Sequence, residues 1–296
     1  EALRARAELR ARVEPVVELF QHKGAMECRN GPGAPTVEAE CDFEQLWPTD
    51  ADDCGEETGT GGMRLWGCVS RHDFVRQALL DGLALEATTG TNPFKLGIIA
   101  ATDTHNGTAG LVAERGFGGH VGTVDDTPGK RLGEGDTVTH DTLINNPGGL
   151  TAVWAEERSR DAIFDALRRR EVFGTTGPRI RVRLFGGWGY DTGLCASPTW
   201  LETADAGGVP MGSDLPLAAD GQGAPTFIAW AEADAGTVER PGVPLSKLQL
   251  VKGWLDADGA THEQVLDLAG DPEPLGTVDA STCETEGPGH ETLCSV

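Results

Sequence analysis

The residues best suited to chemistry lie in the segment AATDTHNGTAG, residues 100–110, where one threonine separates Asp103 from His105. A strand-like run, KLGIIAA, leads into this segment and a glycine-rich stretch follows it. Because alternate side chains of a strand point the same way, we expect Asp103 and His105 on one side of a strand end. Carboxylate and imidazole together suit Zn²⁺, Mn²⁺ or Fe. The pattern indicates a metal site; a polar turn that caps the next segment is the alternative.

A second carboxylate, Glu18, lies inside the apolar run VVELF, residues 16–20. An unpaired charge in a buried strand is costly, so Glu18 needs either a metal or a nearby Lys or Arg. If its strand and the Asp103 strand converge at one rim, their side chains form a metal cluster. We predict Glu18, Asp103 and His105 as ligands of divalent metal ions.

Three further polar residues are predicted to contribute to catalysis. His120, in the glycine-rich run GFGGHVG, would act as a further ligand or a proton donor, with a solvated loop histidine as the alternative. Arg179 follows a turn at the entrance of a strand, where a guanidinium would clamp an anionic oxygen. Lys95 would steady the same oxyanion. Ordinary surface ion pairs are the alternative for both cations.

The charge balance limits which classes of partner the protein is expected to bind. The chain has 24 basic and 47 acidic side chains and a net charge of −23, a field that repels nucleic-acid phosphates and anionic membranes. No run approaches the roughly 20 apolar residues of a membrane span. We therefore expect no nucleic-acid partner and no membrane insertion. A small anionic ester would need local positive charge from a metal or an arginine. The oligomeric state is not indicated.

Common catalytic motifs of other classes are missing. The chain contains no G-x-S-x-G, no P-loop and no G-x-G-x-x-G between a strand and a helix. Serine-nucleophile and nucleotide-binding functions therefore lack support.

Seven cysteines occur and none forms a C-x-x-C pair, which argues against a zinc knuckle or a thioredoxin-like site. Four of them lie in a Gly-, Pro- and Asp-rich stretch that would benefit from covalent cross-links. We predict one or two disulfides there and a Cys283–Cys294 bridge, hence an oxidising compartment, periplasmic or extracellular. Free buried thiols are the alternative. The four early cysteines are Cys28, Cys41, Cys54 and Cys68.

Sequence patterns also predict the elements that position these residues. Residues 1–13 form a charged helix that Pro15 ends, and residues 16–21 form a buried strand. A long loop precedes an amphipathic helix over residues 70–87 with Ser70 as its N-cap. Residues 94–103 form a short strand that ends at Asp103.

The second half of the chain contains what resembles a βαβ unit. Residues 150–155, 159–171 and 180–188 read as strand, helix and strand, an arrangement typical of parallel sheets and barrels. Later segments alternate as strands, and the last stretch shows no closing element. We predict an α/β domain over residues 1–185 and a β-rich, truncated extension over residues 186–296.

Several blocks together resemble a known family. KLGIIAATDTHNG is similar to the late metal-binding motif of the PHP (polymerase and histidinol phosphatase) superfamily. The chain resembles more closely a large bacterial family of PHP-like proteins that is classed as a domain of unknown function. The blocks are EPVVELFQHKGAMECRN, CDFEQL, NPFKLGIIAATDTHNGT, RDAIFDALRRREVFGTTGPRI and LQLVKGWLDADG.

The resemblance implies a fold and an activity. It implies a distorted (β/α)7 barrel and a two- or three-metal centre that activates water to hydrolyse phosphoesters. Asp103 and His105 match the late Asp-x-His pair, and Glu18 matches a strand carboxylate that bridges metals. PHP proteins begin with a His-x-His strand, which this chain lacks. We therefore expect a fragment, the C-terminal part of the barrel, that holds only part of the ligands.

Two functions follow as hypotheses, with a third as a minor alternative. The first is a metal-dependent hydrolase of phosphoesters or related anionic esters. The second is a non-catalytic, secreted binding or structural module on the same scaffold; a His-x-His strand encoded before Glu1 would favour the enzyme. The third is a calcium-stabilised extracellular domain that uses the acidic loop from Asp50 to Glu57, whose spacing does not fit an EF-hand.

Overall fold

The chain divides into two compact units. The computed structural model describes residues 1–30, 38–42, 44–45, 51–55, 57, 59, 67–113, 115–131, 146–219, 221–239, 241–271, 277–278, 281–282, 285–286 and 289–296. The first unit comprises residues 1–177 and 253–264, and the second comprises residues 178–252 and 265–296. The predicted boundary at residue 185 lies inside strand β6 (Arg181–Gly187), which pairs along its whole length with β8 (Thr226–Glu232) of the second unit.

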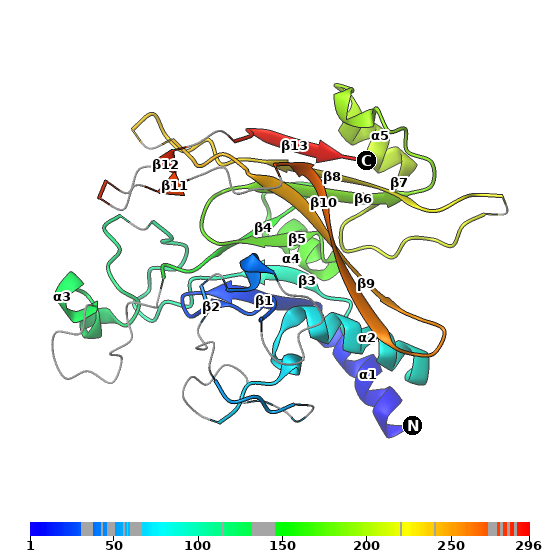
Figure 1. Ribbon diagram of the computed structural model, residues 1–296, viewed down its shortest axis with the longest axis horizontal. Helices are drawn as coiled ribbons and strands as arrows, with labels where there is room; N and C mark the ends of the chain where they lie inside the picture. The colour runs from blue at the N-terminus through cyan, green and yellow to red at the C-terminus, as the bar shows by residue number, and fades with distance from the viewer. Residues whose placement is uncertain are drawn as a thin grey trace. The chain divides into compact units, whose positions relative to one another are not determined.

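A three-stranded sheet in the order β2–β1–β3 carries the candidate residues of the first unit (Figure 1). β1 (Val16–Gln21) and β3 (Gly97–Ala100) are parallel, and β2 (Gly24–Ala25) turns back antiparallel to β1. Helix α1 (Ala2–Val13) precedes β1 and contacts helix α2. Both the helix over residues 1–13 and the strand over residues 16–21 are confirmed.

Two disulfides close the irregular segment after β2. Cys28 is bonded to Cys41, which lies in the short 3-10 helix η1 (Ala39–Asp42), and Cys54 is bonded to Cys68. The prediction of one or two bridges among the first four cysteines is confirmed. The predicted calcium loop falls partly outside the described residues, since Asp50 and Glu56 are not among them.

Helix α2 (Val75–Thr89) follows the 3-10 helix η2 (Arg71–Asp73). Ser70 caps η2: its Oγ accepts from the backbone N–H of His72, and the Asp73 carboxylate accepts from the N–H of Ser70. The predicted cap is therefore present, but it begins a short 3-10 helix that precedes α2.

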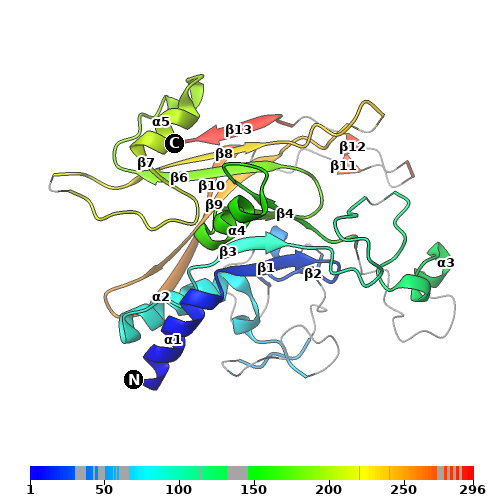
Figure 2. The same ribbon diagram turned by 180° about the vertical axis from the view of Figure 1, so that it is seen from behind.

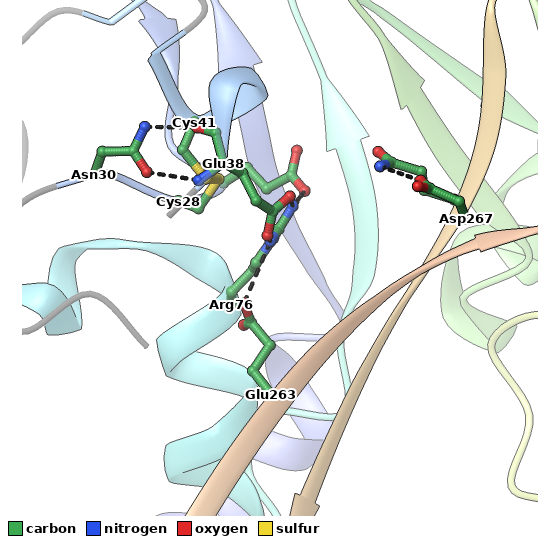
Figure 3. Close-up of polar contacts among 9 residues, drawn as sticks. Cys28, Asn30, Glu38, Cys41, Arg76, Glu263 and Asp267 are labelled. Atoms are coloured by element: carbon green, nitrogen blue, oxygen red, sulfur yellow. Dashed lines mark hydrogen bonds and ion pairs between the residues drawn. A yellow bond between two sulfur atoms is a disulfide. The ribbon is translucent and has the colours of Figure 1, made fainter. Parts of the chain in front are cut away.

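Arg76 of α2 binds several carboxylates at once (Figure 3). Its guanidinium donates to Glu27 and Glu38 at 2.7 Å each and to Glu263 at 3.3 Å. Arg76 and Glu263 are almost fully buried, so these charge-assisted bonds offset the desolvation of the ions. The network joins to α2 the segments around both ends of the Cys28–Cys41 loop and the start of strand β10 (Thr261–Gly270).

The predicted βαβ unit is wrong. β4 (Leu150–Val153) pairs antiparallel with β5 (Val172–Thr175), and helix α4 (Arg160–Arg169) lies between them in sequence. Ser159 does cap α4, accepting from the N–H of Ala162. The short run VFGT forms β5, so the chain returns to β4 directly after helix α4. Strand β6, which was predicted to pair with β4, pairs with β8 instead.

The second unit is built on an antiparallel sheet in the order β13–β8–β6–β7, with helix α5 beside it (Figure 2). β7 spans Gly208–Pro210, β13 spans Thr292–Ser295 and α5 spans Trp200–Gly207. The chain therefore does end on a paired strand, contrary to the expectation. Phe185 and Ile228 are fully buried between the sheet and α5, where they pack with Leu194 and Ala204.

A third disulfide joins Cys195, in the 3-10 helix η5 (Leu194–Ala196), to Cys294 of β13. The predicted Cys283–Cys294 bridge is therefore wrong; Cys283 itself lies outside the described residues. The pairing follows from the fold, because β13 lies next to β8 over the core that contains η5. Three disulfides indicate an oxidising environment.

The remaining elements are short or lie at unit boundaries. The 3-10 helix η3 (Gly122–Val124) and helix α3 (Pro128–Arg131) follow β3. β9 (Lys247–Leu255) pairs with β10 (Thr261–Gly270), and β11 (Thr277–Val278) pairs with β12 (Thr285–Glu286). The fold is thus mixed α/β with several small sheets, and within the described residues none of these sheets closes into a barrel.

No helix in the described part of the chain is long and apolar enough to cross a membrane.

We predict that the Cys195–Cys294 bridge stabilises the second unit more than a short-loop bridge would. Its sequence separation is 99 residues, against 14 for Cys54–Cys68. By loop entropy, the double variant Cys195→Ala/Cys294→Ala should lose roughly 4–5 kcal/mol of unfolding free energy, and Cys54→Ala/Cys68→Ala about 3 kcal/mol. Urea unfolding measures both. Equal stability of the first variant and the unaltered chain would contradict the prediction.

Candidate functional site

The carboxyl ends of β1 and β3 bring two pairs of polar residues to one edge of the sheet. His22 and Lys23 follow β1 directly, and Asp103 and His105 follow β3 after a short extension. The two strands pair in parallel, with Val16 opposite Gly97 and Phe20 opposite Ala100. The segments that follow them therefore leave the sheet at the same edge. Functional residues gather at this edge in many parallel sheets.

Asp103 is the central acceptor of the site. Its Oδ2 atom lies 3.3 Å from Nε2 of His22 and accepts a hydrogen bond from the Lys23 ammonium, while Oδ1 lies 3.6 Å from Nε2 of His105. Lys23 also donates to the side-chain oxygen of Gln21 at 2.7 Å. His22 is buried, whereas His105 is largely exposed. One carboxylate therefore faces two imidazole nitrogens and one ammonium.

The backbone of Asp103 is strained. Its φ angle is +49°, in the left-handed region that non-glycine residues seldom occupy. Such a residue costs of order 1–3 kcal/mol unless its surroundings compensate, and strain of this kind is concentrated at functional sites. The Asp103 carboxylate is thus positioned by a left-handed backbone conformation.

The two carboxylates near Lys23 have pKa values shifted in opposite directions. Partial burial raises the pKa of Asp103, but the hydrogen bond and charge of Lys23, followed by His22 and His105, outweigh it and lower the pKa. Burial and the negative charge of Asp103 raise the pKa of Glu18, only partly offset by Lys23 and Gln21. Glu18 is close enough to feel the Asp103 charge, and its side chain on β1 is partly desolvated by its neighbours while still reaching solvent.

A buried His–Asp pair lies against this edge. The ring of His120 is centred 4.0 Å from that of His22 and 6.1 Å from that of His105, and the His22 and His105 rings are 6.2 Å apart. Nδ1 of His120 lies 2.6 Å from Oδ2 of Asp125. We call His22, Lys23, Asp103, His105 and His120 the imidazole cluster.

Backbone contacts fix the loop that carries His120 to the segment after β3. The N–H of His105 donates to the carbonyl of His120 at 2.6 Å, and the side chain of Asn106 donates to the carbonyl of Gly119 at 2.8 Å. On the β1 side, the N–H of Asn146 donates to the carbonyl of His22. Three segments far apart in sequence therefore meet at the cluster.

The predicted site residues do not all lie in this cluster. Asp103, His105 and His120 are brought together, and Glu18 lies beside them. Lys95 precedes β3, at the opposite end of the strand from Asp103, and its ammonium faces Glu86 at 3.5 Å. Arg179 belongs to the second unit, where its backbone N–H donates to Asp234. The catalytic roles proposed for Lys95 and Arg179 stay predictions.

Sequence reasoning missed His22, Lys23 and Asp125. His22 and Lys23 carried the same signal as Asp103, since they directly follow a predicted strand of the same apolar type. Asp125 carried no comparable signal, because it is one of many acidic residues. Its pairing with His120 depends on how the loop between residues 119 and 125 folds.

As the side chains stand, no group of three or more His, Cys, Asp or Glu among the described residues is placed to hold a metal ion. The chain belongs to the family described as Protein of unknown function (DUF3604), whose family model matches residues 2–291. No curated protein and no solved structure matches it. Membership of the PHP superfamily stays a prediction.

We predict that Gly119 is required for the His120–Asp125 pair. A Cβ on Gly119, which has a φ of +78°, would lie 2.5 Å from Oδ1 of Asp125 and 2.3 Å from its carbonyl oxygen. Gly119→Ala should therefore lose about 2 kcal/mol or more of unfolding free energy, combining left-handed strain with this clash. Thermal or urea unfolding provides the measurement.

Two neighbouring glycines serve as matched controls. Gly122 has a φ of +55° and nothing within 4 Å of its added Cβ, so Gly122→Ala should show only the strain, about 1 kcal/mol. Gly118 has an equally open Cβ position without positive φ, so Gly118→Ala should change little. Equal effects of all three substitutions would contradict the predicted role of Gly119.

Proposed function

We propose that the chain, as a member of the DUF3604 family, is part of a metal-dependent hydrolase of phosphoesters or related anionic esters. The observation that carries the proposal is the arrangement at Asp103, where Nε2 atoms of His22 and His105 face the two oxygens of one strained carboxylate. Carboxylate and imidazole donors suit Zn²⁺, Mn²⁺ and Fe.

The donor set fits a divalent metal in kind, and two separations, each to a different oxygen of Asp103, have the length expected of ligand atoms on one ion. Two ligand atoms bonded to one tetrahedral ion at about 2.1 Å lie about 3.4 Å apart. The His22–Asp103 and His105–Asp103 separations of 3.3 and 3.6 Å are close to that value. His22, Asp103 and His105 would hold the ion, and Glu18 would lie beside it. The resemblance to PHP proteins suggests that further ligands come from a His-x-His strand of the barrel.

A divalent ion bound here would lower the pKa of a water molecule far below its value in bulk water and so supply hydroxide near neutral pH. The chain's own residues have complementary tasks. Asp103, whose pKa is lowered, stays ionised as a donor. The ammonium of Lys23 lies beside it and would bind an anionic ester oxygen once released from Asp103. This local positive charge is needed because the protein's net charge of −23 repels such a substrate.

The proposal includes a compartment and a substrate class. An oxidising compartment is indicated by the disulfides, and we place the protein in the periplasm or outside the cell. The substrate is a small anionic ester rather than a nucleic acid, because a polyanion would meet the acidic surface over a much larger area.

A second candidate function is a non-catalytic binding module. The observation in its favour is Lys23: its ammonium already occupies the carboxylate that a metal would need. In that case the Lys23–Asp103 pair would only stabilise the sheet edge.

We predict that divalent metal binding and ester hydrolysis depend on Asp103 and His105. Asp103→Asn and His105→Ala should each reduce bound Zn²⁺ or Mn²⁺ by tenfold or more and reduce turnover of p-nitrophenyl phosphate and bis-p-nitrophenyl phosphate to background. Metal analysis and steady-state assays provide the readouts, and chelator should abolish activity in the unaltered chain.

Asp126→Asn is the matched control, since Asp126 is a partly exposed carboxylate paired with Lys130. It should leave metal content and turnover unchanged. If metal content and turnover were the same in the Asp103 and His105 variants as in the control, the metal-dependent hydrolase would be ruled out and the binding module favoured.

We further predict that Lys23 competes with the metal. Two unit charges 4 Å apart interact by about 4 kcal/mol at the effective dielectric near a protein surface, so an ammonium on Asp103 opposes a neighbouring divalent ion. Lys23→Met should therefore tighten Zn²⁺ binding about tenfold or more, measured by competition with a chromogenic chelator. Lys130→Met, which removes an ammonium paired with Asp126, is the control and should leave affinity unchanged. Weaker binding in Lys23→Met would contradict the competition.

A further inference from the structure

We propose that His120 is a third imidazole donor of the same metal site, and that Asp125 is the positioning residue that prepares it. The inference rests on the proposed function and extends it, because it adds a ligand from a loop and selects the metal. An imidazole-rich set with one carboxylate favours Zn²⁺ over the oxygen-preferring ions Mg²⁺ and Ca²⁺.

The first step is the tautomer of His120. Asp125 accepts three hydrogen bonds, from the backbone N–H groups of His120 and Val121 at 2.8 Å each and from Nδ1 of His120 at 2.6 Å. A carboxylate in this environment is ionised and can only accept, so Nδ1 of His120 carries the proton it donates. Nε2 of neutral His120 is then left with its lone pair, the form that binds a metal.

The second step is the burial of the pair. The side chains of His120 and Asp125 are only 5% and 1% exposed. In the part of the chain that the structure describes, the other close His–Asp pairs off the cluster have side chains that are 30–42% exposed. Those pairs are His72–Asp81, His262–Asp256 and His290–Asp271. A solvated loop histidine, the alternative for His120, is therefore excluded.

The loop is also built around Asp125. Gly119 is in the left-handed region and leaves no room for a side chain beside the Asp125 carboxylate, and Arg131 donates to the carbonyl of Asp125 at 2.7 Å. The pair is thereby fixed on both sides, and the His120 ring is directed against the ring of His22.

The third step is the geometry of the three rings. Three imidazoles bound to one tetrahedral ion, with metal–nitrogen bonds of about 2.1 Å, have ring centroids about 5 Å apart. The observed separations of 4.0, 6.1 and 6.2 Å lie on either side of this value. The rings do not converge as they stand: convergence requires rotation of the exposed His105 side chain and separation of the buried His22 and His120 rings, which lie 4.0 Å apart.

The role of Asp125 is that of a carboxylate which orients a ligand histidine. Loss of such an outer partner usually weakens metal binding 10- to 100-fold. A structural His–Asp pair would not affect metal affinity, so the two roles are separable by experiment.

The test uses the full chain with its disulfides intact and Zn²⁺ alone as the probe. His120→Ala and Asp125→Asn should each weaken Zn²⁺ binding 10- to 100-fold, and the double variant should bind no more weakly than His120→Ala, because Asp125 acts through His120. Asp126→Asn, the adjacent partly exposed carboxylate, should bind like the unaltered chain. Mg²⁺ and Ca²⁺ should not compete for the site at tenfold excess over Zn²⁺.

A second readout does not need a metal or a perfectly stable variant. Nitrogen-15 NMR of the unaltered, metal-free chain should show His120 as the Nδ1–H tautomer, and Asp125→Asn should shift it towards Nε2–H. Circular dichroism checks that each variant is folded; if Asp125→Asn is not, His120→Ala and the NMR spectrum decide.

The outcomes separate this inference from the proposed function. If Asp103→Asn loses Zn²⁺ while His120→Ala binds it normally, the inference is overturned and the hydrolase proposal stands. An Nε2–H tautomer in the unaltered chain also overturns the inference, whatever the affinities. If the unaltered chain binds no Zn²⁺, both fail together.

Discussion

The parallel pairing of β1 with β3 is the constraint on which the candidate site depends. It sends two chain segments, separated by about eighty residues, out of the sheet at one edge, so that His22 and Lys23 meet Asp103 and His105. An antiparallel pair in the same register would place the two ends on opposite edges. The register of the pair shifts between Glu18 and Phe20, and Glu18 is exposed.

Electrostatics at this edge depend on one cation shared between two carboxylates. Lys23 binds Asp103, whose pKa falls, while partial desolvation and then repulsion from Asp103 raise the pKa of Glu18. Carboxylates whose environments push their pKa values apart are typical of acid–base and metal sites. A further positive charge would relieve this repulsion, and three imidazole rings lie within 6.2 Å of one another at this edge.

Sequence patterns predicted local features well and long-range pairings poorly. The cap at Ser159 and the bridges near Cys28 follow from short-range chemistry and are present. The strand predicted over residues 94–103 is also present but is shorter, Gly97–Ala100, and ends before Asp103. The antiparallel β4–β5 pair and the Cys195–Cys294 bridge depend on which distant segments meet, which composition and spacing do not encode. His22 was missed for a different reason: the strand that precedes it was recognised, but its carboxyl end was not examined as a ligand position.

The imidazole cluster contains features that a purely structural sheet edge would not retain. Left-handed Asp103, buried His22 and the enclosed Asp125 each lower stability unless compensated, and none adds apolar burial. Hydrophobic residues at the same positions would satisfy the fold more simply, as Phe20 and Ala100 do one step inside the sheet. Three unfavourable features, contributed by three separate segments, meet at one sheet edge. This pattern is expected of a functional site rather than of a scaffold. The β1–β3 edge is therefore the candidate site, whichever ion or substrate it serves.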